Sequence, residues 1–372
     1  MVKIKTFAEH RSEMLIADYK EGRLSRRDFL FAASVLGIAP SLVTSQLGHA
    51  QAQELVLAGN WGGDQLKSVN STWVKTYQEK TGNKMSVDGS NPSNPKIRAM
   101  VESKHVVWDI IDAGTAAMSE LGPRGQLEEI DYSIVDRDQL LPGFDFKHGI
   151  ANYLFAVVLV WNTKLVSGRP TIQDYYDLKK YPGKRTMRKS AIPQMELALL
   201  GDGVPRDQVY PMDRARALNK LKSVKDDVIF WETGSQSESL LRDGECSMGL
   251  LWYDRAVVLK RQSKGQIDFT FENGILQQGA WVVPVGNKAG KKASMIAMAA
   301  FQDPQCQVDF FKLQNNGPAN PRANALVPPD LQAINPGSPA NLAVMVKIGT
   351  NWYLQGDNFR VGQQAFLDLF SS

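Results

Sequence analysis

Short apolar runs alternate with segments of helical periodicity along the chain from residue 55 onward. The runs predict strands, and the segments between them carry apolar residues at the three- and four-residue spacing of helices. This alternation is typical of parallel strands joined by crossover helices, and therefore of a three-layer α/β architecture. We expect strands at 55–58, 84–87, 108–113, 154–161, 228–231, 248–252 and 281–285. We expect helices at 64–82, 95–103, 115–121, 212–224, 235–242, 292–302 and 305–313, and an ordered loop over 317–339.

The chain has 372 residues, which is too long for one ordinary hydrophobic core. Two lobes of roughly 150 residues each suit this length. The formal net charge of +4 is small, and the basic residues form no dense run. A nucleic-acid partner is therefore not expected.

The N-terminal segment has the three parts of a secretory signal. Arg26 and Arg27 stand between Ser25 and Asp28-Phe29, an apolar stretch of about 15 residues follows, and Ala50 and Ala52 form an A-x-A cleavage site. The adjacent arginines resemble the twin-arginine export motif. We expect residues 1–52 to be removed by cleavage, after export by the twin-arginine translocase to the periplasm.

Residue types that carry catalysis are sparse. After the expected cleavage, the remaining histidines are His105 and His148, and neither has a second ligand at metal spacing. The chain contains no G-x-S-x-G elbow and no complete phosphate-binding loop. We therefore expect no enzyme activity, no cofactor and no metal. The two cysteines, Cys246 and Cys306, are either buried free thiols or an exported disulfide.

Aromatic residues stand at the ends of predicted strands. Trp61 follows the first strand beside Gly62, and Trp252 and Tyr253 end a later one. Ligands of open α/β sheets bind beyond the carboxyl ends of strands, where aromatic faces contact organic solutes. The alternative is that these rings belong to the core.

Several blocks of the chain resemble, in order, the solute-binding subunits of ABC importers, in their spermidine/putrescine-type group. The blocks are Asn60-Trp61-Gly62-Gly63, Thr81-Gly82, Trp108–Asp112, Gly125–Tyr132, Asp177-Leu178 with Tyr181–Lys184, Asp243–Glu245, Gly249–Trp252 and Trp281–Pro284. The resemblance implies a bilobal type 2 periplasmic binding fold with a ligand cleft between two α/β lobes. Lobe 1 would combine residues 53–155 with 281–345, and lobe 2 would combine 156–280 with 346–372. The protein would act as a monomer that delivers its solute to permease subunits.

The departures from this family concern the substrate. Acidic cleft positions of the polyamine binders correspond here to Lys189-Ser190, Pro193 and Gly279, and an aromatic position corresponds to Gln277. Cations beside a polycationic ligand would be repulsive in a partly dry cleft. We therefore expect an anionic or zwitterionic solute. The expected ligand-binding residues are Trp61, Gly62, Thr115, Arg188, Lys189, Ser190, Trp252, Tyr253, Arg255 and Gln277.

Three alternatives stay open at this stage. An exported enzyme with a cleft active site would show turnover or colour, and a polyamine receptor would bind spermidine or putrescine. A receptor that signals its occupancy to a sensor would lack neighbouring permease genes.

Overall fold

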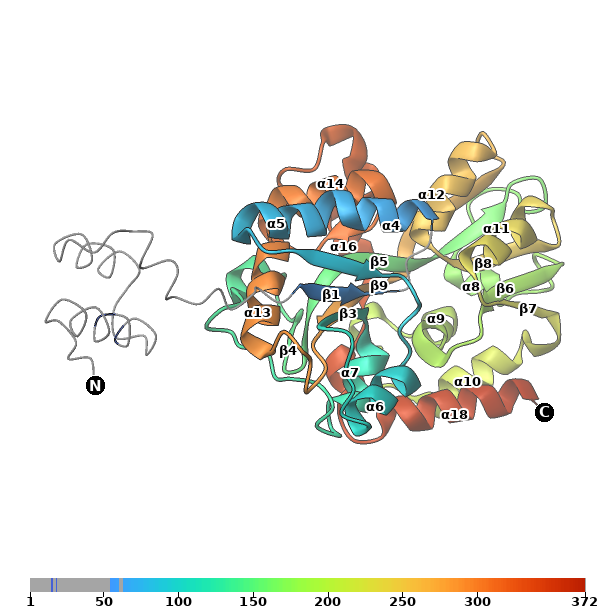
Figure 1. Cartoon of the computed structure of the whole chain (residues 1–372). Helices are drawn as coiled ribbons and strands as arrows, with labels where there is room; N and C mark the ends of the chain where they lie inside the picture. Colours follow the sequence, from blue (N-terminus) through green and yellow to red (C-terminus); the bar gives the residue numbers. More distant parts are fainter. Residues whose placement is uncertain (1–14, 16–17, 19–53, 60–62, 372) are drawn as a thin grey trace, which may run out of the picture. The chain divides into compact units, whose positions relative to one another are not determined.

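Two long antiparallel strands run through the middle of one large mixed sheet. The computed structural model describes residues 15, 18, 54–59 and 63–371, and the description below concerns these residues. Their sheet has 11 strands, with the main order β2-β1-β3-β9-β5-β8-β6-β7 (Figure 1). The strands are β1 (Leu55–Ala58), β2 (Met85–Asp88), β3 (Ile110–Ala113), β4 (Asp145–Phe146), β5 (Gly149–Asn162), β6 (Lys184–Arg188), β7 (Val228–Trp231), β8 (Cys246–Trp252), β9 (Ile267–Val282), β10 (Gly317–Pro318) and β11 (Val346–Lys347).

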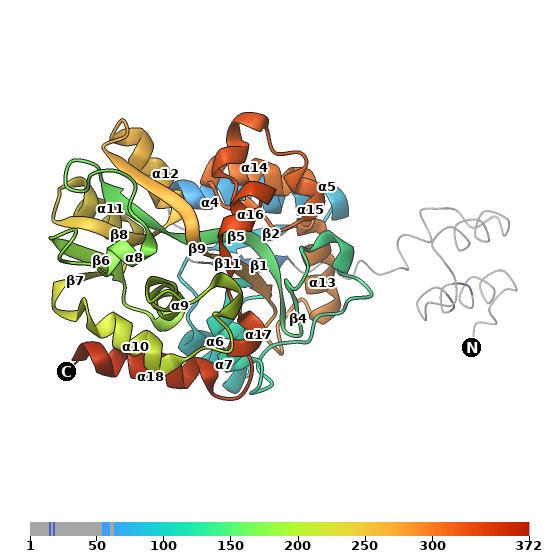
Figure 2. The ribbon, with the colours of Figure 1, turned by 180° about the vertical axis from the view of Figure 1, so that it is seen from behind.

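Helices cover both sides of this sheet, as Figures 1 and 2 show from opposite directions. The α-helices are α4 (Gly63–Val69), α5 (Lys75–Thr81), α6 (Asn94–Glu102), α7 (Thr115–Leu121), α8 (Ile172–Tyr175), α9 (Ala191–Gly201), α10 (Arg214–Lys222), α11 (Gly234–Arg242), α12 (Tyr253–Gln262), α13 (Lys291–Phe301), α14 (Pro304–Gln314), α15 (Pro321–Asn324), α16 (Pro339–Val344), α17 (Thr350–Tyr353) and α18 (Asn358–Ser371). A π-helical turn, Asn70–Val74, joins α4 to α5. Short 3-10 turns lie at Arg137–Gln139, Arg206–Gln208, Lys225–Asp227 and Pro329–Ile334.

The strand directions place two sets of strand ends opposite each other. β1, β2 and β3 are mutually parallel, and so are β6, β7 and β8. β3 ends where its Ala113 pairs with Ala280 of β9, which in turn pairs with Ala151 of β5. β8 ends where Trp252 pairs with Val157 of β5. The carboxyl ends of both sets therefore point toward the middle of β5. They are separated along this strand by the distance from Ala151 to Val157, about 20 Å at roughly 3.3 Å per residue.

Buried polar side chains fix the strands that carry these ends. The Asp109 carboxylate accepts the backbone N–H groups of Val56 in β1 and Ala289, both at 2.8 Å, and so holds β3 in place. Arg185 of β6 is fully buried and donates to the carbonyls of Tyr175, Tyr181 and Gly183. Every such bond removes a desolvation cost that an unpaired buried group would carry.

The core contains several apolar clusters rather than one. One cluster joins β1 to α5, α13 and α14 through Trp73, Trp281 and Phe310. A second packs α9 and α10 against β5, β6 and β8 around Met187 and Leu197. From residue 54 onward the chain forms one compact unit. Among the described residues, no helix combines the length and apolar character needed to cross a membrane.

The expected mixed α/β fold is confirmed. Strands 55–58 and 228–231 and helix 115–121 have the predicted bounds. The expected strand at 281–285 was wrong in its extent, because it is the end of the 16-residue β9. The tract 317–339 contains short helices besides its loops. Cys246 and Cys306 are buried free thiols, and burial raises the pKa of each to about 12. The export signal lies outside the described residues.

Candidate functional site

The facing strand ends bring chemically active side chains toward one region. β2 ends at Asp88, and β3 is followed by Gly114 and Thr115. From the opposite side, β6 ends at Arg188 and β8 at Trp252. Ligands of open α/β sheets bind at such ends, because the loops that follow the strands diverge there.

Arg188 and Trp252 form the most distinct pair of this region. The guanidinium carbon of Arg188 lies 5.1 Å from the centroid of the Trp252 ring, within range of a cation–π contact. Trp252 packs edge-on against the buried Trp231 at 4.8 Å. The Arg188 side chain is exposed to solvent, yet surrounding protein lowers its pKa by desolvation. Both properties fit a surface side chain that protein partly surrounds, and an arginine stays charged there.

Lys189 and Ser190 continue from Arg188 into α9. Lys189 is exposed, with its ammonium 6.0 Å from the Phe230 ring centroid. Ser190 occupies the N-cap position without a side-chain cap bond, and the N–H of Ala191 donates to Gln363 of α18. Ile192 and Pro193 depart from helical backbone angles. The first turn of α9 behind the two cations is therefore irregular.

Arg255 and Tyr253 follow Trp252 in α12. Arg255 forms ion pairs with Glu238 at 3.4 Å and Asp254 at 3.2 Å, so two carboxylates already face it. Tyr253 is fully buried, and its ring packs against Phe271. The structure thus places Tyr253 in the core beside the strand end. Trp61 and Gly62 lie outside the described residues.

Thr115 and Gln277 lie at the crossing strands. The Thr115 hydroxyl is buried between the hydroxyl of Thr350 at 3.2 Å and the amide of Gln278 at 3.1 Å. Gln277, next to Gln278 in β9, pairs in register with Phe155 of β5. Its amide nitrogen is buried without a hydrogen-bond partner among the described residues.

Sequence reasoning missed a polar group that spans three strands. Asp112 near the end of β3 accepts the amide of Asn152 at 2.7 Å and the hydroxyl of Tyr153 at 3.0 Å, both from β5. β9 lies between these strands, and its Gly279 leaves the room they need. Burial, followed by the charges of Asp112 and Asp254, raises the pKa of Tyr153. An aspartate near a strand end, two residues before Gly114, was the available sequence signal.

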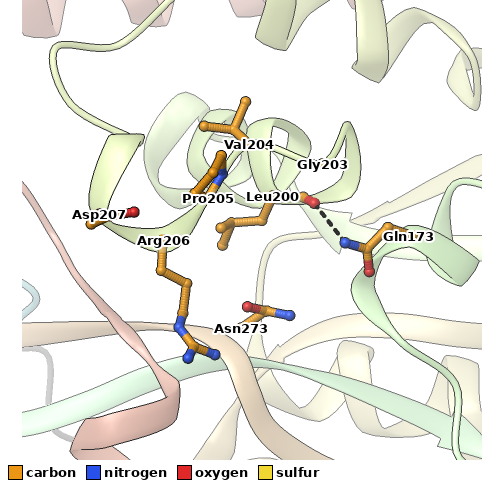
Figure 3. A pocket seen from close by; sticks show the side chains of 8 residues that line it. All are labelled: Gln173, Leu200, Gly203, Val204, Pro205, Arg206, Asp207 and Asn273. Carbon is orange, nitrogen blue, oxygen red and sulfur yellow. Dashed lines mark hydrogen bonds between the residues drawn. The ribbon is translucent and has the colours of Figure 1, made fainter.

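A separate hollow of about 540 Å³ lies at the opposite end of α9 (Figure 3). It is lined by Leu200, the turn after α9 and Asn273 of β9, and Gln173 donates to the carbonyl of Leu200 at 3.1 Å. None of the residues that end a parallel strand lines it. The residues at the strand ends are therefore the better candidates for solute binding. No group of metal-ligating side chains is found among the described residues.

Comparison with known proteins connects this architecture to a family. Residues 72–335 match the sequence profile of the bacterial extracellular solute-binding proteins. A gamma-aminobutyric acid (GABA)-binding protein of Pseudomonas aeruginosa is 27% identical over 308 residues, which cover 81% of this chain and 87% of the relative.

Solved structures show the same similarity. A GABA receptor superposes with a TM-score of 0.77 and 30% identity over 86% of this chain and 98% of its own. The protein AgtB from A. tumefaciens R10, solved with agropinic acid, has a TM-score of 0.74 and 25% identity. The match covers 86% of this chain and 99% of AgtB. The spermidine/putrescine protein PotD of Streptococcus pneumoniae reaches 0.66 at 16% identity over 86% and 98%, which supports the fold alone.

Proposed function

Since the chain belongs to the bacterial extracellular solute-binding protein family, we propose that it captures a small zwitterionic solute at the facing strand ends. It is a solute-binding protein of an ABC importer, and its relatives are binding proteins rather than enzymes.

The exposed guanidinium of Arg188 is the observation that carries this proposal. No ion pair joins it to a carboxylate within residues 54–59 and 63–371, whereas Arg255 of α12 has two. A guanidinium fixed against an aromatic ring presents donors in a planar fork that matches a carboxylate. The unpartnered amide nitrogen of Gln277 is a further donor in the strands between the two sets of ends.

The relatives support an anionic group in the solute. GABA, named in the Pseudomonas protein and in the solved receptor, carries a carboxylate and an amine. The agropinic acid of AgtB is also an acid by name. A polyamine has no anionic group, and Arg188 and Lys189 would repel it. We therefore favour an amino-acid-like zwitterion over spermidine or putrescine.

We propose the two lobes that the family resemblance implies, and the facing strand directions support them. Residues 53–155 with 281–345 would form lobe 1, and 156–280 with 346–372 would form lobe 2. β5 and β9 cross between them, so bending of these two strands would change the distance between the strand ends. In this scheme the chain reaches the periplasm as a monomer through the twin-arginine pathway, and the closed form docks on the permease.

Isothermal titration tests the anion at Arg188. We expect the wild-type protein to bind GABA or another straight-chain amino acid and to ignore putrescine. Arg188→Gln should weaken binding about ten- to hundred-fold, because it removes a charge-assisted hydrogen bond of about 1.5–3 kcal/mol. Arg206→Gln, an exposed arginine at the separate hollow, is the matched control and should bind normally. Tight putrescine binding, or an unchanged Arg188→Gln variant, would reject the proposal.

A further inference from the structure

Asp112, Asn152 and Tyr153 form a preorganised polar group in the middle of the crossing strands. Asn152 is almost fully buried, and its side-chain oxygen also accepts the backbone N–H of Tyr153 at 2.8 Å. Its amide and the Tyr153 hydroxyl both donate to Asp112. Two donors thus fix the orientation of one half-buried carboxylate.

The group exists because the intervening strand has no side chain at one position. A Cβ atom on Gly279 would lie 2.3 Å from the Asn152 side-chain oxygen and 2.8 Å from the Tyr153 ring. Real Cβ atoms do not approach other atoms so closely, so any other residue would displace both side chains. The pairing register of β5 also shifts between Ala151 and Leu154. Such an irregularity redirects side chains and recurs beside functional sites.

The negative charge of Asp112 at the β3 end makes this group suitable for a cation, because both of its fixed neighbours are neutral. Asp254, which follows the β8 end, also acts on the Tyr153 hydroxyl, but its charge is paired with that of Arg255. The Trp73 ring, stacked 6.1 Å from that of Tyr153, and Phe310 close its other side with apolar surface.

We propose that Asp112, held by Asn152 and Tyr153, binds the cationic amine of the solute, while Arg188 faces its anionic group. This inference rests on the proposed function and extends it to a solute with separated opposite charges. A carboxylate whose orientation is already fixed binds an ammonium without losing further side-chain entropy.

The test compares ligands with and without the amine. The probes are straight-chain amino acids of three to six carbons, GABA included, each paired with the fatty acid of equal length. Titration of the wild-type protein should show a preference for the amino acid. Asp112→Asn should reduce this preference about tenfold or more, and Tyr153→Phe should reduce it several-fold. Affinity for the fatty acid should stay unchanged in both variants.

Matched controls separate this effect from general damage. Asp131→Asn removes a half-buried aspartate that accepts from Ser133, and Tyr132→Phe removes a hydroxyl that donates to the Phe146 carbonyl. Both should keep the wild-type preference. If Asp112→Asn does not fold, the amino-acid preference of Tyr153→Phe alone tests the amine site.

The outcomes distinguish the two proposals. A wild-type protein that binds fatty and amino acids equally well would overturn the amine site and leave the anion site standing. An amino-acid preference that survives in both Asp112→Asn and Tyr153→Phe would also overturn the amine site. A wild-type protein that binds no probe would overturn both.

Discussion

The guanidinium of Arg188 lies 5.1 Å from the centroid of the Trp252 ring, although the two residues are far apart in the sequence. They meet because β6 and β8 are adjacent parallel strands that end at the same edge. The ring contacts the cation without accepting a conventional hydrogen bond from it. This pair is the basis of the anion site that we propose at the edge of the sheet.

Replacement of Trp252 by leucine should weaken solute binding several-fold. An exposed cation–π contact stabilises by about 0.5–1 kcal/mol, and its loss frees the arginine to sample other rotamers. Titration measures the change. Trp352→Leu is the control, since the Trp352 ring lies 5.3 Å from the Arg214 guanidinium carbon in the same kind of contact but belongs to helix α17 and ends no strand. Equal affinities in the two variants would show that the Trp252 ring has no part in binding.

Gly279→Ala should destabilise the fold by about 1–3 kcal/mol and reduce the amine preference. The added methyl would collide with Asn152 and Tyr153, whose side chains cross above it. Gly362→Ala in α18 is the contrast, because its methyl would meet only Met195 sulfur at 3.7 Å. Alanine is also the better helix former, by about 0.5–1 kcal/mol. Urea unfolding compares the two variants. A Gly279→Ala protein as stable as the wild type would contradict the packing argument.

Glu196 should make the wild-type protein less stable as pH rises above about 4.5. Burial raises the pKa of this carboxyl above its ordinary value of 4.5, against the lowering effect of bonds from the Tyr353 and Tyr210 hydroxyls. The folded state therefore holds the proton over a pH range in which the unfolded state releases it. Stability is fully present below the unfolded pKa and declines until the folded pKa is passed.

The variant Glu196→Gln tests this sign. Its amide oxygen can still accept both tyrosine hydroxyls, but it cannot titrate. Thermal unfolding from pH 4 to 8 should show that its stability relative to the wild type increases with pH. A relative stability that is constant or decreases over this range would mean that Glu196 does not retain its proton on folding.

Bending of β5 and β9 predicts a compaction that scattering can detect. The radius of gyration should fall when a bound amino acid draws the facing strand ends together. The same protein with the paired fatty acid should compact less, because only one set of contacts is made. An unchanged radius at saturating amino acid would argue against a hinge in these strands.

Local sequence signals predicted several of the short parallel strands, although not β6, which ends at Arg188. Leu55–Ala58 and Val228–Trp231 are short apolar runs followed by polar or turn residues, so their bounds were readable. The bounds of β9 were not readable, because Asp268, Glu272 and Asn273 interrupt its apolar pattern. Its pairing with both β3 and β5 is a tertiary property that no local window contains.

The expected site residues came from two different signals. Trp252 ends a strand that its apolar run predicted, whereas Arg188 was expected from the family resemblance, since no strand was predicted before it. Asp112 and Tyr153 meet only across Gly279, and their contact depends on the order of three strands. Sequence reasoning considered Gly279 as a position that lacks an acid. The structure shows that its missing side chain makes room for the polar group.

The solute itself is the most direct test of the account. Protein purified without dialysis can be denatured, and the released molecule identified by mass spectrometry. We predict a small compound that carries both a carboxylate and a basic amine. A polyamine, or a neutral sugar without either charge, would contradict the claim that Arg188 and Asp112 hold opposite ends of one ligand.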